Sequence, residues 1–189
     1  TKLAASVAHV NGRNLVGAES FTAGPPNGRW QNHPNLLKQL GDAVWCQGVN
    51  RYIFHRYAHQ PWPPEVVPGM TMGQWGTHFD RTNTWWEMGR EWMAYIARSQ
   101  FLLQQGRFAA DVLFLGGENA PSTGVFSREL KAAGHDYDSV GTDLLFALRE
   151  EDREVVLPGG MRYQLLVLPD DTTMTPAVAR KLAELAREG

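Results

Sequence analysis

An acidic side chain and a group of imidazole and phenol side chains each follow a short apolar segment of the chain. Glu19 follows the apolar residues 15–18, and the second group follows the apolar residues 52–54. This second group consists of His55, Tyr57 and His59. In folds that alternate strands and helices, functional groups lie where the carboxyl end of a strand meets its loop. We therefore expect both groups at one edge of a parallel sheet.

These residue types are the ones that glycoside cleavage requires. One carboxyl group protonates the leaving oxygen, and a second acts as a nucleophile or as a base that activates water. Trp30 and Trp75 lie in loops rich in glycine and proline, where an indole can stack on the apolar face of a sugar ring. Two simpler interpretations stay open. Glu19 could be a helix cap or an ion-pair partner, and the two tryptophans could pack within their loops.

The residues themselves do not indicate metal or disulfide chemistry. On one face of a strand, His55 and His59 would lie ~13 Å apart, which is too far for one zinc ion. We expect them to form hydrogen bonds to the substrate or to Glu19 instead. The single cysteine, Cys46, excludes an internal disulfide. Its place in a predicted helix favours a buried structural thiol.

The elements that must position these residues follow from hydrophobic periodicity and from the residues that begin and end helices. The predicted helices cover 3–10, 34–47 and 84–105, and the predicted strands cover 15–18 and 52–54. Pro34 is a favoured first-turn residue, and the spacing of Thr84 and Glu87 is that of a capping box. This βαβα order has too few strands to close an eight-stranded barrel, so it could form only the closing quarter of one.

The composition changes near residue 108. All seven tryptophans precede residue 93, and the rest of the chain is aliphatic and charged. In this second part, the predicted strands cover 112–115, 155–157 and 165–168. One predicted helix ends at 134, a second covers 142–148 and a third begins at 176. This alternation is flavodoxin-like. Between these elements, capping and turn roles are predicted for Glu118, Asp136 and Asp138.

The composition also excludes several classes of protein. With 189 residues, 43% of them hydrophobic, the chain can form a packed core and is not disordered. A formal charge of −2 argues against a nucleic-acid binder. No stretch approaches the ~18 apolar residues of a membrane span. We therefore expect neither nucleic acid nor a membrane as a partner.

Several motifs together resemble glycoside hydrolase family 106, the α-L-rhamnosidases. They lie within Ala8–Thr22, Gly48–Pro61, Pro68–Thr77 and Arg81–Trp86. The resemblance implies a (β/α)8 TIM barrel, inverting hydrolysis of terminal α-L-rhamnosides and a calcium ion in the sugar site. Glu19 matches the family's glutamate at the end of the seventh barrel strand, which implies a general base. The general acid and most calcium ligands are expected on earlier strands, so the metal ligands stay unknown here. A retaining mechanism with Glu19 as nucleophile stays open.

The sequence thus predicts two parts of a longer polypeptide. Residues 1–108 would be the C-terminal quarter of a glycosidase barrel. Residues 109–189 would be a partial flavodoxin-like domain, similar to class I glutamine-amidotransferase-like domains but without the cysteine that amidotransfer needs.

Several expectations follow for the protein as a whole. We expect a rhamnose-containing glycan or glycoside as substrate, the rest of its own longer chain as partner, a secreted or periplasmic location, and no activity from this part alone. Two other functions stay open: another exo-glycosidase such as a β-galactosidase, and a non-catalytic carbohydrate-binding protein.

Overall fold

The structure, a computed structural model, describes residues 1–119 and 127–189. These residues form two compact units. We call Gly17–Gln105 the central unit, and we call Thr1–Val16 together with Gly106–Gly189 the terminal unit. Each unit combines helices with a small sheet or sheets, so the mixed α/β class predicted from the sequence is confirmed.

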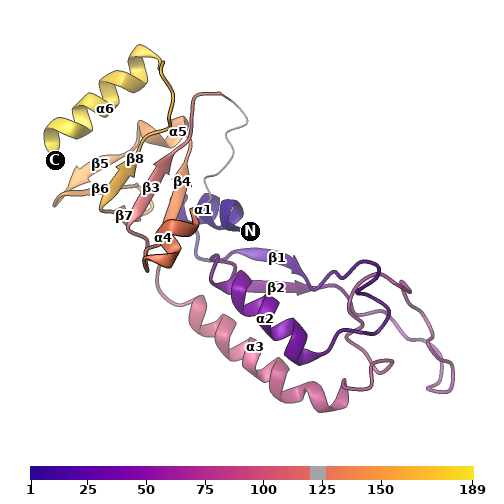
Figure 1. Ribbon diagram of the computed structural model, residues 1–189. Helices are drawn as coiled ribbons and strands as arrows, with labels where there is room; N and C mark the ends of the chain where they lie inside the picture. The colour runs from indigo at the N-terminus through magenta and orange to yellow at the C-terminus, as the bar shows by residue number, and fades with distance from the viewer. Residues whose placement is uncertain (120–126) are drawn as a thin grey trace. The chain divides into compact units, whose positions relative to one another are not determined.

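The central unit is built on two parallel strands, β1 (Gly17–Ser20) and β2 (Arg51–Phe54). Helix α2 (Pro34–Trp45) connects them, and a single 3-10 turn, η1 (Glu87–Gly89), leads into helix α3 (Arg90–Leu103). Proline fits the first turn of α2 because an N–H group there has no partner within the helix. In Figure 1 the loops that follow β1 and β2 gather beyond the arrowheads of both strands.

One face of this strand pair is covered and the other is open. Tyr52 of β2 is buried, and its ring stacks on Trp45 of α2 with the centroids 5.1 Å apart. Glu19 of β1 and its register partner Ile53 are both exposed. Side chains alternate between the two faces of a strand. The burial of Tyr52 against α2 therefore directs Glu19 and Ile53 to the open face.

The described residues of the terminal unit form two small sheets. The first is parallel, with β3 (Val112–Leu115) between β4 (Tyr137–Val140) and β8 (Leu165–Val167). The second is antiparallel and consists of β5 (Arg149–Glu151), β6 (Glu154–Val156) and β7 (Arg162–Tyr163). The helices are α1 (Lys2–Val10), α4 (Arg128–Ala132), α5 (Thr142–Leu145) and α6 (Pro176–Glu188). Leu113, Leu145 and Val178, from β3, α5 and α6, share one aliphatic core.

Helix α1 packs against β4 through a buried carboxylate. Asp138 of β4 is fully buried and accepts hydrogen bonds from Ser6 Oγ (2.8 Å), His9 Nδ1 (3.0 Å) and Tyr163 OH (3.0 Å). Residues 1–16, which the sequence predicts as part of one domain with the residues up to 108, pack within the terminal unit. The barrel and flavodoxin-like assignments themselves stay predictions.

Three sequence-based expectations are wrong. Thr84 begins no helix but lies in a turn, because Trp85 donates a hydrogen bond of 2.8 Å to the Asn32 carbonyl and is fixed there by the tertiary structure. Asp138 is not a turn residue, since it lies inside β4 with its charge satisfied by buried donors. Cys46 is not buried, because α2 ends one residue earlier and the thiol lies exposed at the helix terminus.

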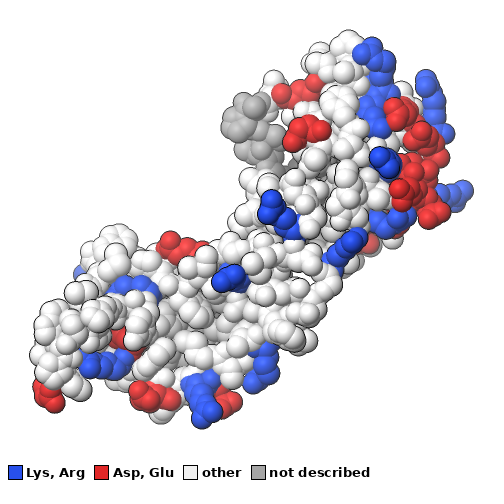
Figure 2. Space-filling model, turned by 180° about the vertical axis from the view of Figure 1, so that it is seen from behind, with Lys and Arg blue, Asp and Glu red and all other residues white. Residues whose placement is uncertain are grey.

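Charged side chains gather on the antiparallel sheet of the terminal unit. Arg162 forms ion pairs with Glu151 (3.3 Å), Asp152 (3.7 Å) and Glu154 (2.5 Å). Figure 2 shows this patch of mixed sign, and it shows the central unit as mostly uncharged with scattered charges. Within the described residues, no helix has the length and apolar character needed to cross a bilayer.

Candidate functional site

Glu19 lies one residue before the end of β1, with an exposed side chain on the open face of the central unit. Thr22 Oγ1 donates a hydrogen bond of 2.5 Å to Glu19 Oε1. In the described part of the chain, no lysine, arginine or histidine nitrogen lies within 4.0 Å of this carboxylate. Glu19 therefore neither caps a helix nor pairs with a described cation, and its carboxylate is accessible to a ligand.

His55 follows β2 and is fixed beside the end of β1. Its backbone N–H donates to the Ser20 carbonyl (3.0 Å), and its carbonyl accepts from the Thr77 N–H (3.0 Å). A Cβ on Gly76 would lie 2.3 Å from His55 Nδ1, and Gly76 has a φ of +77°. Only glycine fits at this position, so the loop backbone lies directly against the imidazole. His55 Nδ1 is buried and has no hydrogen-bond partner among the described residues.

The other two residues of the predicted group lie farther out in the loop. The side chain of Tyr57 is 73% exposed, and His59 is exposed as well. The structure therefore fixes His55 at the strand ends through Ser20. It provides no contact in the described residues that joins Tyr57 or His59 to Glu19.

The two predicted sugar-stacking tryptophans differ in how they are held. Trp30 is half-buried, its indole stacks on the His78 ring with centroids 3.8 Å apart, and its Nε1 donates to Thr82 Oγ1 (2.8 Å). Trp75 is 49% exposed, and its ring lies 3.2 Å from the place of a Cβ on Gly24. Trp30 is thus fixed on one face and at its nitrogen, whereas Trp75 lies in contact with a loop backbone.

Three ionisable side chains that the sequence analysis did not single out form the most buried part of this region. Arg56, His78 and Asp80 are 7%, 0% and 2% exposed. Arg56 Nη1 and Asp80 Oδ2 lie 3.8 Å apart, and neither atom has a hydrogen-bond partner among the described residues. Buried polar atoms without partners are rare and need a specific explanation. The sequence gives no signal for these three residues, because they lie in a segment without helical or strand periodicity.

The protonation state of His78 follows from this burial. Desolvation lowers the pKa of His78 below its ordinary value of 6.5, and the nearby Arg56 guanidinium lowers it further. Burial also lowers the pKa of Arg56, although a guanidinium stays charged at any ordinary pH. The imidazole of His78 is therefore neutral at pH 7 and can act as a hydrogen-bond acceptor.

We expect the central unit to lose stability as the pH falls below 6.5. Unfolded His78 takes up a proton near this pH while folded His78 stays neutral, so the unfolded state binds more protons and the free energy of unfolding decreases. All seven tryptophans lie in the central unit. The urea midpoint measured by tryptophan fluorescence at pH 7.5 and at pH 5.5 therefore reports on this unit.

Two variants identify His78 as the cause of the pH dependence. The difference between the two midpoints should shrink in His78→Gln and persist in His59→Gln, because His59 is exposed. An equal pH dependence in His78→Gln and in the unmodified chain would contradict the assignment.

The described residues do not form a complete metal site. Within 1–119 and 127–189, no group of three or more His, Cys, Asp or Glu side chains lies close enough to hold a metal ion. Calcium takes six to eight oxygen ligands. The calcium ion that the family resemblance implies therefore stays an expectation.

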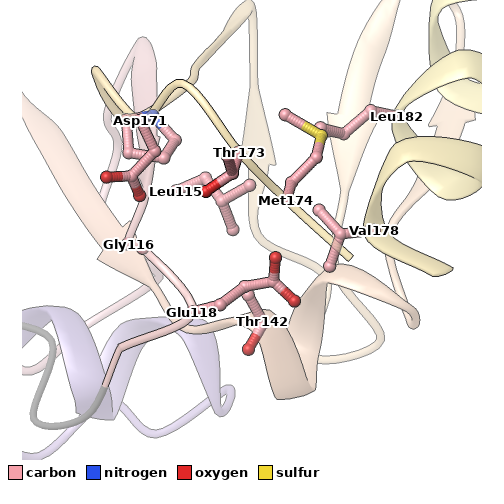
Figure 3. A pocket seen from close by; sticks show the side chains of 11 residues that line it. Leu115, Gly116, Glu118, Thr142, Asp171, Thr173, Met174, Val178 and Leu182 are labelled. Carbon is pink, nitrogen blue, oxygen red and sulfur yellow. The ribbon is translucent and has the colours of Figure 1, made fainter. Parts of the chain in front are cut away.

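A small pocket of the terminal unit lies at the carboxyl ends of its parallel strands. Its lining includes Gly116, Glu118, Thr142 and Val178, and Figure 3 shows the Glu118 carboxylate between the strand ends and α6. Glu118 accepts hydrogen bonds from both N and Oγ1 of Thr175, each 2.7 Å long. The carboxylate thus fixes the start of α6, which agrees with the predicted capping role. Because Glu118 has this structural role, we assign the candidate site to the central unit and not to this pocket.

Three comparisons relate this chain to known proteins. The sequence profile of a glycoside hydrolase family, described as alpha-L-rhamnosidase, matches residues 1–189. The chain is 44% identical over 188 residues to a protein of Formosa agariphila named "Putative beta-glucuronidase", covering 100% of this chain and 16% of that protein. The solved structure of a rhamnosidase from Novosphingobium sp. PP1Y is similar with a TM-score of 0.80 at 37% identity, covering 96% of this chain and 17% of that one. The chain thus spans well under a fifth of the length of either protein.

Proposed function

Since the chain belongs to glycoside hydrolase family 106, the family of the alpha-L-rhamnosidases, we propose that it is part of a glycosidase that hydrolyses terminal α-L-rhamnosides. The substrate would be a rhamnose-containing glycan or glycoside. The proposal depends above all on one observation: Glu19 presents an exposed carboxylate at the carboxyl end of a parallel strand.

The proposal assigns the central unit to the closing quarter of a (β/α)8 barrel. In such a barrel, parallel strands are covered by helices on the outer face and line the interior with the other face. The parallel pair β1–β2 has α2 against one face and leaves the face of Glu19 and Ile53 open. For the terminal unit, a flavodoxin-like assignment is supported by β3, which lies between two parallel neighbours.

In this proposal Glu19 is the general base of an inverting mechanism. Its carboxylate would take a proton from the attacking water, and a general acid on an earlier barrel strand would protonate the leaving oxygen. The hydrogen bond from Thr22 Oγ1 restricts the rotation of the Glu19 carboxylate. Because the acid would lie outside this chain, we expect the 189-residue chain alone to be inactive.

The substrate would contact the loops beyond the strand ends. Trp30 and Trp75 would stack on the sugar, and His55, Tyr57 and His59 would form hydrogen bonds to hydroxyl groups. Trp75, Tyr57 and His59 are exposed in these loops. Calcium would be held by ligands from other parts of the longer polypeptide.

A β-glucuronidase is the second candidate, because it is the activity named for the relative from Formosa agariphila. The two sugars differ in configuration and also in the substituent on ring carbon C5, which is a methyl group in rhamnose and a carboxylate in glucuronate. A carboxylate needs a cation or several donors in its pocket, whereas a methyl group needs an apolar wall. A site built for one should therefore reject the other.

The assay compares 4-nitrophenyl glycosides in the longer polypeptide that contains this chain. We expect kcat/KM for the α-L-rhamnoside to exceed that for the β-D-glucuronide by at least ~100-fold, because an unpaired charge at the sugar site is strongly disfavoured. The reverse ratio would establish the second candidate. Preference for the β-D-galactoside would indicate another exo-glycosidase. Binding of L-rhamnose without cleavage of any of the three would indicate a carbohydrate-binding protein.

A further inference from the structure

The half-buried Trp30 belongs to a closed circuit of contacts that includes the buried cluster of the central unit. We call this circuit the Trp30 network. Its members are Trp30, Arg56, Thr71, His78, Asp80 and Thr82. In the stacking arm, the indole face contacts His78, which is linked through Thr71 to Arg56. In the nitrogen arm, the indole nitrogen is linked through Thr82 to Asp80. The Arg56–Asp80 ion pair closes the circuit.

The direction of each hydrogen bond in the nitrogen arm is fixed by the chemistry of its ends. The indole Nε1–H of Trp30 can only donate, and the carboxylate of Asp80 can only accept. The Thr82 hydroxyl between them must therefore accept from Trp30 (2.8 Å) and donate to Asp80 Oδ1 (2.5 Å). The Thr82 backbone N–H also donates to Asp80 Oδ1 (2.9 Å). This arm has a single arrangement of protons.

The same argument assigns the tautomer of His78. Thr71 Oγ1 accepts from Arg56 Nη2 (2.8 Å) and from the Gly73 N–H (3.0 Å). Both of its lone pairs are then used, so its one proton is donated to His78 Nε2 at 2.8 Å. His78 is therefore a neutral ring protonated on Nδ1, in agreement with its lowered pKa. A neutral ring can stack on the indole without bringing a second positive charge next to Arg56.

The backbone at Trp30 is held in an unfavourable conformation. Arg29 and Trp30 both have φ values of 60°, in the left-handed region that non-glycine residues seldom occupy. The loop also lies tightly against its neighbour, because a Cβ on Gly28 would lie 1.8 Å from the Gln74 carbonyl oxygen. Such conformations persist where surrounding contacts determine them, and they are common at binding and catalytic sites. The Trp30 network provides these contacts.

We propose that His78 and Asp80 are positioning residues, which hold the Trp30 indole as a fixed platform for the apolar face of a sugar ring. The inference rests on the proposed function, since it takes the ligand to be a glycoside. One face of the indole is occupied by His78, and its N–H is occupied by Thr82. The outer ring face is therefore the part of Trp30 that can meet the substrate, by stacking and not by a hydrogen bond.

The matched variants Thr82→Val and Thr82→Ser test the nitrogen arm in the longer polypeptide. Valine keeps the shape of threonine but cannot accept from Trp30 or donate to Asp80, whereas serine keeps the hydroxyl. We expect Thr82→Val to raise KM for the 4-nitrophenyl α-L-rhamnoside by ~3–10-fold, the range for one lost hydrogen bond, with kcat changed less than about twofold. We expect Thr82→Ser to stay within about twofold of the unmodified protein in both constants.

A second readout measures the indole itself and does not depend on activity. The protein is labelled with 5-fluorotryptophan, and the 19F signal of Trp30 is identified by its loss in Trp30→Phe. This signal should move or broaden in Thr82→Val and stay unchanged in Thr82→Ser. If it does not move in Thr82→Val, the positioning role is overturned. If it moves while KM stays unchanged, the positioning role stands, but Trp30 is not a substrate platform and that part of the proposed function fails.

A pair of variants at His78 tests the stacking arm and covers the case in which Thr82→Val does not fold. His78→Phe keeps a flat ring against the indole, and His78→Gln keeps an acceptor for Thr71 but removes the ring. We expect KM to rise more in His78→Gln than in His78→Phe, and the Trp30 signal to move more as well. Equal behaviour of the two variants would contradict the role of stacking.

Discussion

Replacing Glu19 by glutamine in the longer polypeptide is expected to lower kcat for the α-L-rhamnoside by ~10²–10⁴-fold, the range for losing a general base. The amide has the size of the carboxylate but cannot accept the proton of the attacking water. Thr22 Oγ1 can still donate to the remaining carbonyl oxygen, so the side chain keeps its place. We therefore expect KM, and the affinity for L-rhamnose measured by calorimetry, to change little.

Glu91→Gln is the matched control for this variant. Glu91 is an exposed glutamate in the first turn of α3, and its replacement should leave kcat within about twofold of the unmodified protein. If Glu19→Gln retained full kcat, Glu19 would have no part in the chemistry. A fall in affinity with unchanged kcat would make Glu19 a binding residue and not a base.

Replacing Asp138 by alanine is expected to destabilise the terminal unit by ~3–5 kcal/mol, the range for breaking a buried charged network. The donors Ser6, His9 and Tyr163 would lose their shared acceptor in a region that water does not reach. Burial and the neighbouring Asp138 carboxylate raise the pKa of Tyr163 in the intact network. Hydrogen exchange measured by mass spectrometry should show lost protection in peptides that cover α1 and β4.

The controls for this variant use a second aspartate and the second unit. Asp170→Ala removes an exposed carboxylate of the same unit and should leave the exchange of α1 unchanged. The tryptophan fluorescence of the central unit should also keep its urea midpoint in Asp138→Ala, because no tryptophan lies in the terminal unit. Unchanged protection of α1 in Asp138→Ala would show that apolar packing alone holds this helix.

Elements with strong local signals could be predicted from the sequence. Proline begins α2 at Pro34 and α6 at Pro176, as expected from its fit to a first helical turn, and both predictions are confirmed. The apolar run of β3 is confirmed as a buried strand. Strand β4 could not be predicted, because Asp138 and Ser139 make its sequence polar. Its burial depends on donors from α1 and β7 that are distant along the chain.

Only those site residues that lie at or next to the ends of strands could be predicted from the sequence. The apolar run of residues 15–18 is a local signal for a strand near Glu19, but β1 covers Gly17–Ser20 and so includes Glu19, which was expected after the strand. The partners of Trp30 could not be predicted, because Thr82 is 52 positions away and is brought close by the loops alone. His78 and Asp80 have no periodic pattern around them, and only the tertiary structure shows that they are buried.

The anchoring of α1 by Asp138 has a consequence for the order of events during synthesis. Ser6 and Asp138 are 132 positions apart in the chain. At the usual ~5–20 residues per second of a ribosome, roughly 7–26 s pass before the helix meets its strand. The central unit is a contiguous segment that ends at Gln105, before β4. Within residues 1–189, α1 is therefore expected to reach its partners in β4 only after the whole central unit has been synthesised.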